Sequence, residues 1–168
     1  MAEFVDLVRF LSELGKVGPY AVSKARLVRR WQVLEASPAA KEAFARGGLV
    51  GVIQASELIW EPAYSNVSGV LPATDLPSVG PQGLSLIRFQ LDASAGGPVE
   101  LQFNSASGVT LWLDRTPVEA KERTELSVPA GVHTLTVAFD SRSQSPGLRI
   151  ELMDVTGSPA RLRLIGGK

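Results

Sequence analysis

Few side chains in this sequence could carry out metal or redox chemistry. His133 is its one histidine, cysteine is absent, and Met1 and Met153 are the two methionines. Without cysteine the chain can form no disulfide, no zinc–thiolate site, no cysteine nucleophile and no covalent haem attachment of its own. His133 follows a Pro-Ala-Gly turn, where an imidazole is expected to pack against neighbouring strands. We expect no cofactor and no metal in this chain.

Four side chains are candidates for ligand contact: Trp112, Asp114, Trp60 and Tyr64. Trp112 either fills the core or offers an exposed platform for a pyranose ring. Asp114 follows a predicted strand, where it either forms a turn by accepting hydrogen bonds from nearby amides or accepts a hydroxyl of a sugar. Trp60 and Tyr64 lie in a Pro-rich stretch, where they either line the rim of a groove or pack over the edge of the sheet.

The motifs for catalysis are weak. Glycoside hydrolysis needs two carboxylates at a defined separation, and the available ones each lie near a turn or in a charged surface segment: Asp92, Glu100, Asp114 and Glu119. The sequence lacks G-x-S-x-G and the spacing of a phosphate-binding glycine loop. We therefore expect a protein that is not an enzyme, with a paired-carboxylate glycoside hydrolase as the remaining catalytic alternative.

Charge and composition narrow the classes of partner. Lys plus Arg and Asp plus Glu each number 17 in 168 residues, so the formal net charge is zero, and no basic patch with interleaved aromatics is visible. This balance argues against nucleic-acid binding. No apolar run reaches membrane-spanning length and no signal peptide is visible, so we expect no membrane insertion. A hydrophobic fraction of 45% supports one domain with a core, or a sandwich with a small helical appendage.

Strand patterns dominate residues 98–140. Val99, Leu101 and Phe103 alternate with polar residues, and the alternation recurs at 109–113, with Trp112 on the opposite face, and at 133–139. Further strands are predicted at 25–34, 64–71, 84–91, 148–152 and 162–164, and the strand at 84–91 is expected to be buried on both faces. Short strands separated by Gly, Pro and Ser predict a mostly β fold, an antiparallel jelly-roll-like β-sandwich.

Two short helices accompany the predicted strands. Apolar residues at helical spacing predict one over residues 4–14, ended by Gly15. The second is predicted near 38–46, with Ser37 as its cap, Pro38 in its first turn and Gly47-Gly48 at its end. The abrupt entry into the first helix suggests a piece of a longer protein. We expect residues 1–20 to be the terminal helix and connector of a preceding domain, and 21–168 to form the sandwich.

Several segments resemble those of a known family. FVDLVRFLSELGKVGPYAV resembles the segment that closes the cytochrome c-like portion of large exported haem-binding (CxxCH) and membrane-bound dehydrogenase-like proteins of planctomycete-type bacteria. RRWQVLEAS, WEPAYSNVSGVLP, LWLD, GVHTLTVAFD and IGGK then follow a course similar to the part after the haem domain. The resemblance implies a non-catalytic accessory or interaction domain of a larger exported haem protein. It also implies an extracytoplasmic location and contact with other domains of that parent protein.

LWLD followed by GVHTLTV also looks like the sugar-binding sandwich of the anthrax protective antigen and many glycosidases. This second resemblance implies a carbohydrate-binding module as the alternative function, with carbohydrate as the alternative partner. In lectin members of that family, paired aspartates help to hold calcium. Here residues 104–108 read Asn-Ser-Ala-Ser-Gly at that place, and Asp114-Arg115 replaces the usual Asp-Gly.

Overall fold

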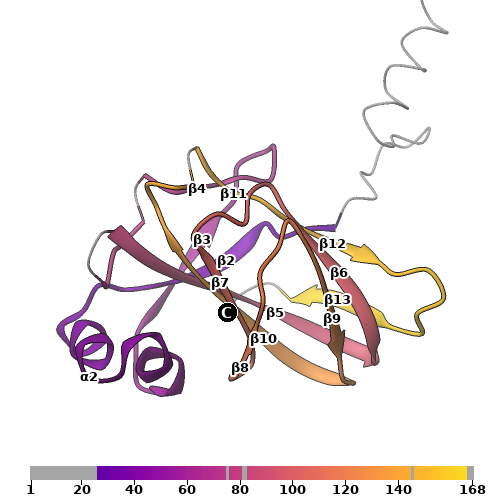
Figure 1. Cartoon of the computed structure of the whole chain (residues 1–168), viewed down its shortest axis with the longest axis horizontal. Helices are drawn as coiled ribbons and strands as arrows, with labels where there is room; N and C mark the ends of the chain where they lie inside the picture. Colours follow the sequence, from indigo (N-terminus) through magenta and orange to yellow (C-terminus); the bar gives the residue numbers. More distant parts are fainter. Residues whose placement is uncertain (1–25, 75, 81–82, 145, 166–168) are drawn as a thin grey trace, which may run out of the picture.

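The computed structural model describes residues 26–74, 76–80, 83–144 and 146–165 (Figure 1). The predicted helix at 4–14, its connector and the last three residues lie outside this part of the chain. The described part is mostly β, with antiparallel sheets and one helix. In chain order its elements are β1 (Arg26–Leu27), β2 (Arg30–Leu34), α2 (Pro38–Gln54), β3 (Trp60–Tyr64), β4 (Leu71–Pro72), β5 (Leu84–Ala95), β6 (Gly97–Phe103), β7 (Val109–Leu113), β8 (Thr116–Val118), β9 (Arg123–Val128), β10 (Gly131–Asp140), β11 (Gly147–Leu148), β12 (Ile150–Asp154) and β13 (Arg161–Ile165).

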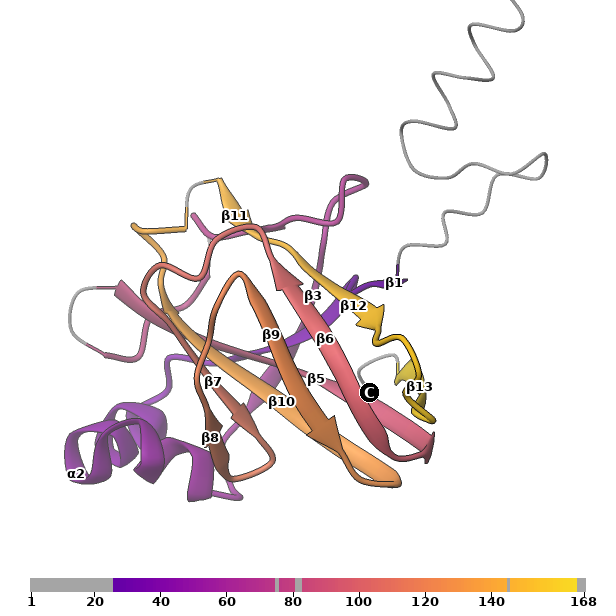
Figure 2. The same ribbon diagram turned by 45° about the vertical axis from the view of Figure 1, so that its right-hand side comes forward.

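Two antiparallel sheets face each other in a sandwich-like arrangement. The four-stranded sheet has the order β1-β12-β6-β9, and the seven-stranded sheet has the order β3-β2-β5-β10-β7-β8, with β13 also paired to β5. In Figure 2, β12, β6 and β9 lie in front of β5, β10 and β7. A two-stranded pair, β11 with β4, closes one end. The coarse prediction of a mostly β, antiparallel fold is confirmed.

The main core lies between the two sheets. Alternation works there as expected, because every second residue of each strand points inward. Leu101 and Ile150 from the four-stranded sheet and Leu111 and Leu135 from the seven-stranded sheet are all fully buried. Trp31 meets Phe89 edge to face, with ring centroids 5.2 Å apart.

A second apolar cluster lies on the other side of the seven-stranded sheet, which we call its outer face. Leu34, Leu86, Trp112 and Ala138 point to this face and pack against helix α2. The long strand β5 serves both clusters, since Leu86 belongs to the outer one while Phe89 belongs to the main core. The prediction that the strand at 84–91 is buried on both faces holds at residues 85–87, whereas Arg88 and Gln90 on the outer face are only half-buried.

Helix α2 begins as predicted and ends later. The Ser37 hydroxyl accepts a hydrogen bond from the Ala40 amide at 3.2 Å, and Pro38 occupies the first turn. Gly48 has φ 60° and ψ −149°, which breaks the helix, but helical turns resume and continue to Gln54. The predicted end at Gly47-Gly48 coincides with this break, and what the sequence did not predict is the second helical segment, which packs onto the sheet through Val52, 1% exposed.

Two strand predictions need correction. The strand predicted at 64–71 is wrong, since β3 ends at Tyr64 and Asn66 closes a turn. The Asn66 amide donates to the carbonyl of Val70 at 2.8 Å, and its side-chain oxygen accepts from the Val70 amide at 3.1 Å. The strand predicted at 25–34 is divided, because β1 pairs with β12 in one sheet and β2 pairs with β3 and β5 in the other.

Candidate ligand-binding groove

A row of polar side chains crosses the outer face of the seven-stranded sheet. Backbone register places Gln32 of β2 beside Arg88 of β5, and Arg88 beside Thr136 of β10. Cross-strand partners point to the same face of a sheet, so these three side chains share the outer face with the residues that pack under α2. Helix α2 lies at one end of the molecule in Figure 1, and its residues pack on this face of the sheet.

A cavity of about 380 Å³ lies between the C-terminal end of α2 and this row. We call it the α2 groove. The sheet and its turns contribute Trp60, Arg88, Asp114, Arg115, Thr134 and Thr136, and the helix end contributes residues 52–56. A groove of this size falls within the range typical of small-molecule sites.

Arg88 is half-buried and firmly positioned in the groove. Its Nε–H donates to the Gln32 side-chain oxygen at 2.7 Å, and its guanidinium lies 4.2 Å from the centroid of the Trp60 ring. Partial burial lowers the pKa of Arg88, because desolvation disfavours the charged form. None of the ion pairs formed among the described residues includes Arg88.

The threonine hydroxyls beside Arg88 are available to a ligand. Thr136 is only 4% exposed, and its hydroxyl makes no hydrogen bond to any residue that the structure describes. Thr134 is half-buried, and its backbone amide, rather than its hydroxyl, is engaged by Asp114. Among the described residues the fully buried side-chain atom without a partner is Gln144 Oε1, so the Thr136 hydroxyl keeps some access to the groove, and a ligand there can supply its partner.

Asp114 has a structural task in addition to lining the groove. It has a positive φ of 55°, and its two carboxylate oxygens accept from the Thr134 amide at 2.9 Å and from His133 Nδ1 at 2.7 Å. His133 Nε2 lies 2.9 Å from the carbonyl of Pro129. Both contacts are to acceptor oxygens, so the imidazolium form can donate to both, and the pKa of His133 is raised, first by the hydrogen bond to Asp114.

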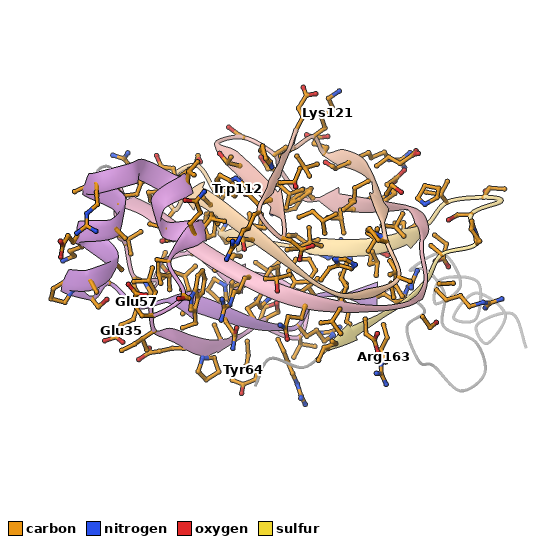
Figure 3. All side chains as sticks on the ribbon, turned by 90° about the horizontal axis from the view of Figure 1, so that it is seen from below. Glu35, Glu57, Tyr64, Trp112, Lys121 and Arg163 are labelled. Atoms are coloured by element: carbon orange, nitrogen blue, oxygen red, sulfur yellow. The ribbon has the colours of Figure 1, made fainter. Side chains whose placement is uncertain are left out.

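The groove contains two of the four residues that the sequence proposed for ligand contact. Trp60 and Asp114 line it, whereas Tyr64 is 65% exposed on the same face of β3 and lies outside it. Trp112 is 5% exposed beneath α2, so the interpretation of Trp112 as an exposed stacking platform is wrong and the packing alternative holds. Figure 3 shows Trp112 among the packed side chains next to the helix, and Tyr64 projecting away from them.

Comparisons with known proteins do not assign this site. No protein-family model, no curated protein and no solved structure matches the chain.

Sequence reasoning missed Arg88, Thr134 and Thr136. Each of them is a polar residue within a strand that is otherwise rich in apolar side chains. That pattern indicates a strand with one partly open face, and it is the sequence feature from which these residues could have been predicted. The identity of the neighbours that surround Arg88 could not be read locally, because Gln32 and Trp60 come from distant segments.

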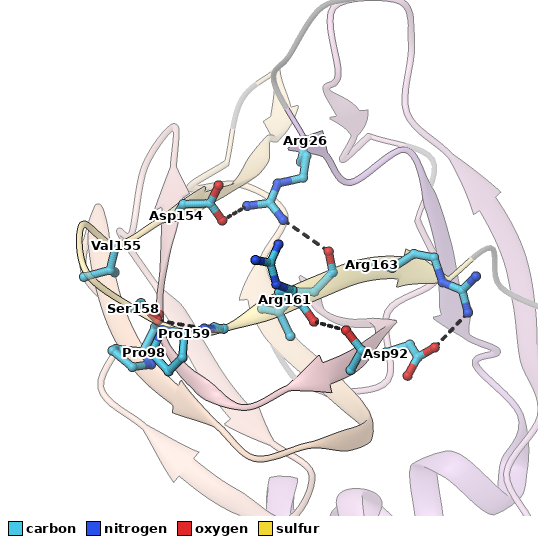
Figure 4. Close-up of a pocket in the computed structure, with 12 residues that line it drawn as sticks. Arg26, Asp92, Pro98, Asp154, Val155, Ser158, Pro159, Arg161 and Arg163 are labelled. Carbon is cyan, nitrogen blue, oxygen red and sulfur yellow. Dashed lines mark hydrogen bonds and ion pairs between the residues drawn. The ribbon is translucent and has the colours of Figure 1, made fainter.

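A larger hollow of about 710 Å³ lies at the opposite end of the sheet (Figure 4). Two of its arginines are matched by its own aspartates, since Arg26 pairs with Asp154 and Arg163 pairs with Asp92 at 2.7 Å. Arg26 also donates to the carbonyl of Leu162 at 3.2 Å. The polar groups of this hollow are thus largely satisfied by one another, in contrast to those of the α2 groove.

The described residues contain no group of three or more His, Cys, Asp or Glu side chains placed to hold a metal ion. Their helix is not long and apolar enough to cross a membrane.

Proposed function

We propose that this chain is a non-catalytic accessory domain that binds carbohydrate in the α2 groove. The observation that carries the proposal is the hydroxyl of Thr136, which lines the groove beside Arg88 and makes no hydrogen bond to a described residue. Among the described residues the fully buried side-chain atom without a partner is Gln144 Oε1, so the Thr136 hydroxyl keeps access to the open space of the groove, where a ligand can reach it. A ligand rich in hydroxyl groups would supply the missing partner.

The chemistry of the groove suits such a ligand. Arg88 offers N–H donors, and the hydroxyls of Thr134 and Thr136 both donate and accept. The Asp114 side chain is 49% exposed and retains lone pairs beyond the two hydrogen bonds it already accepts. Trp60 supplies apolar surface at one side. This combination of a few fixed polar groups around an aromatic wall is typical of sites that bind small polar ligands.

The non-catalytic part of the proposal is supported by the placement of the acidic groups. Asp92 is paired with Arg163, Glu100 with Arg123, and Glu119 with Lys121, and among these four candidates only Asp114 lines the α2 groove. A glycoside hydrolase would need a second carboxylate across the cavity from Asp114. The engagement of both nitrogens of His133 also argues against general-base chemistry.

The wider setting of the domain is proposed from the resemblances of its sequence. We propose that it belongs to a larger exported haem protein, works outside the cytoplasm, and has the jelly-roll order of connections. Docking onto another domain of that parent is the second candidate function. It is favoured by the exposed apolar side chains at and after the end of β3, where Tyr64 is 65% and Val67 is 94% exposed.

The test is binding of the full chain to a glycan panel, followed by calorimetry on the ligands retained. Thr136→Val keeps the shape of the side chain and removes the hydroxyl, and Thr110→Val is the matched control at an exposed position of the same sheet face. We expect Thr136→Val to weaken binding by roughly three- to tenfold, as the loss of one neutral hydrogen bond implies, and Thr110→Val to have no effect. Absence of glycan binding by the wild-type chain would overturn the proposal and leave docking.

A further inference from the structure

Arg88 carries a positive charge that the described residues do not neutralise. It is half-buried, and no carboxylate among those residues forms an ion pair with it. Proteins seldom keep a partly desolvated charge without a counter-charge, because the lost hydration is not repaid. Two of the three arginines that line the larger hollow show the usual arrangement, with Arg163 paired to Asp92 and Arg26 to Asp154.

The groups that contact Arg88 offset only part of the cost of burying its positive charge. Gln32 accepts one hydrogen bond, and the face of Trp60 adds a cation–π contact. The nearest acidic group that lines the groove, Asp114, is already engaged by His133 and by the Thr134 amide. The C-terminal end of α2 carries only a partial negative charge from its peptide dipoles, because the segment after the break at Gly48 is short. It therefore does not replace a carboxylate as the partner of Arg88.

The local charge of the α2 groove is therefore positive, in a chain whose formal net charge is zero. Arg115 adds a second cation at the rim of the groove, and it too forms no ion pair with a described residue. Nε of Arg88 donates to Gln32, and the guanidinium group lies over the ring of Trp60. The two terminal nitrogens therefore remain as the donors for a ligand. A guanidinium fixed in this way matches the two oxygens of a carboxylate.

We propose that the ligand of the α2 groove is an acidic sugar, a uronic acid residue whose carboxylate is bound by Arg88. This inference rests on the proposed function, because the threonine hydroxyls and Asp114 are assigned to the hydroxyl groups of the same sugar. A protein carboxylate is the competing source of the negative charge. The sugar is favoured because the site is a concave cavity of about 380 Å³ that also presents the Thr136 hydroxyl, which makes no hydrogen bond to a described residue.

The experiment compares the full chain binding to oligogalacturonate and to a neutral galactose oligomer of the same length, by calorimetry at low salt. We expect the acidic oligomer to bind roughly ten- to hundredfold more tightly, as charge-assisted hydrogen bonds imply, and the preference to shrink as NaCl is raised. Arg88→Lys keeps the charge but loses the planar fork, so it should remove most of the preference. Arg163→Gln, outside the α2 groove, is the matched control and should leave it unchanged.

The outcomes separate the two proposals. Equal binding of the acidic and neutral oligomers would overturn the acidic-sugar inference and leave carbohydrate binding intact. Absence of binding to either oligomer, together with binding to a polyglutamate peptide, would overturn both in favour of a protein partner. If Arg88→Lys fails to fold by circular dichroism, the comparison of the two oligomers on the wild-type chain still decides the inference.

Discussion

Replacing Thr136 with valine should make the unliganded protein more stable. Thr136 is 4% exposed and its hydroxyl has no hydrogen-bond partner among the described residues. Burying a hydroxyl completely without a partner costs about 1–3 kcal/mol, but the fully buried atom without a partner among the described residues is Gln144 Oε1, so only part of this cost applies to Thr136; valine has nearly the same shape. Because the groove gives the hydroxyl some access to water, we take the lower end and expect a gain of about 1 kcal/mol in the free energy of unfolding.

Urea unfolding, monitored by circular dichroism, measures this gain. With a slope of about 2 kcal/mol/M, typical of a small domain, the midpoint should rise by about 0.5 M while the slope stays the same. Thr110→Val, at an exposed position of the same sheet face, should change the midpoint little. A fall of 1 kcal/mol or more for Thr136→Val, beyond the precision of the method, would mean that the hydroxyl is satisfied in the folded chain, and the reasoning would fail.

Three further predictions concern other parts of the fold. The folded pKa of His133 is raised above its ordinary value of 6.5, so its contribution to stability should be complete below about pH 6.5 and be lost as the pH rises through the folded pKa. Urea midpoints measured across this pH range should fall accordingly, and His133→Gln should make them less dependent on pH. Trp112→Ala should lower stability by roughly 3–5 kcal/mol, since it empties the cluster beneath α2; an unchanged melting curve would contradict that packing. At Gly147 a Cβ would lie 2.0 Å from the carbonyl oxygen of Leu71, so Gly147→Ala should be strongly destabilising, whereas Gly47→Ala, with nothing within 4 Å, should be neutral or raise the melting temperature.

Strands that face the main core could be predicted from the sequence because one of their faces is uniformly buried. Leu111, Leu135 and Val137 alternate with their neighbours and lie where the pattern places them. The pattern also put Trp112 on the opposite face correctly. It could not show that this face is covered at Trp112, because the cover is helix α2, which lies far away in the sequence.

The ends of the helix and strands, and the residues of the α2 groove, are set by contacts between segments that are distant in the sequence. Gly48 does break the helix as its sequence predicts, but the second helical segment, which packs on the sheet through Val52, was not predicted. Asn66 ended a predicted strand by bonding to its own turn. In the sequence Arg88 is one polar residue of a strand, and only the assembled strands show that it forms no ion pair with a described residue and that Gln32 and Trp60 contact it.

The most direct test of the account is a nuclear magnetic resonance titration of the labelled full chain with an acidic oligosaccharide. The account predicts that the amides of Arg88, Thr134 and Thr136 and the indole of Trp60 shift together, with one dissociation constant. It also predicts that amides of β6 and β9, in the other sheet, stay in place. Shifts confined to β6 and β9, or to the hollow around Arg161, would contradict it.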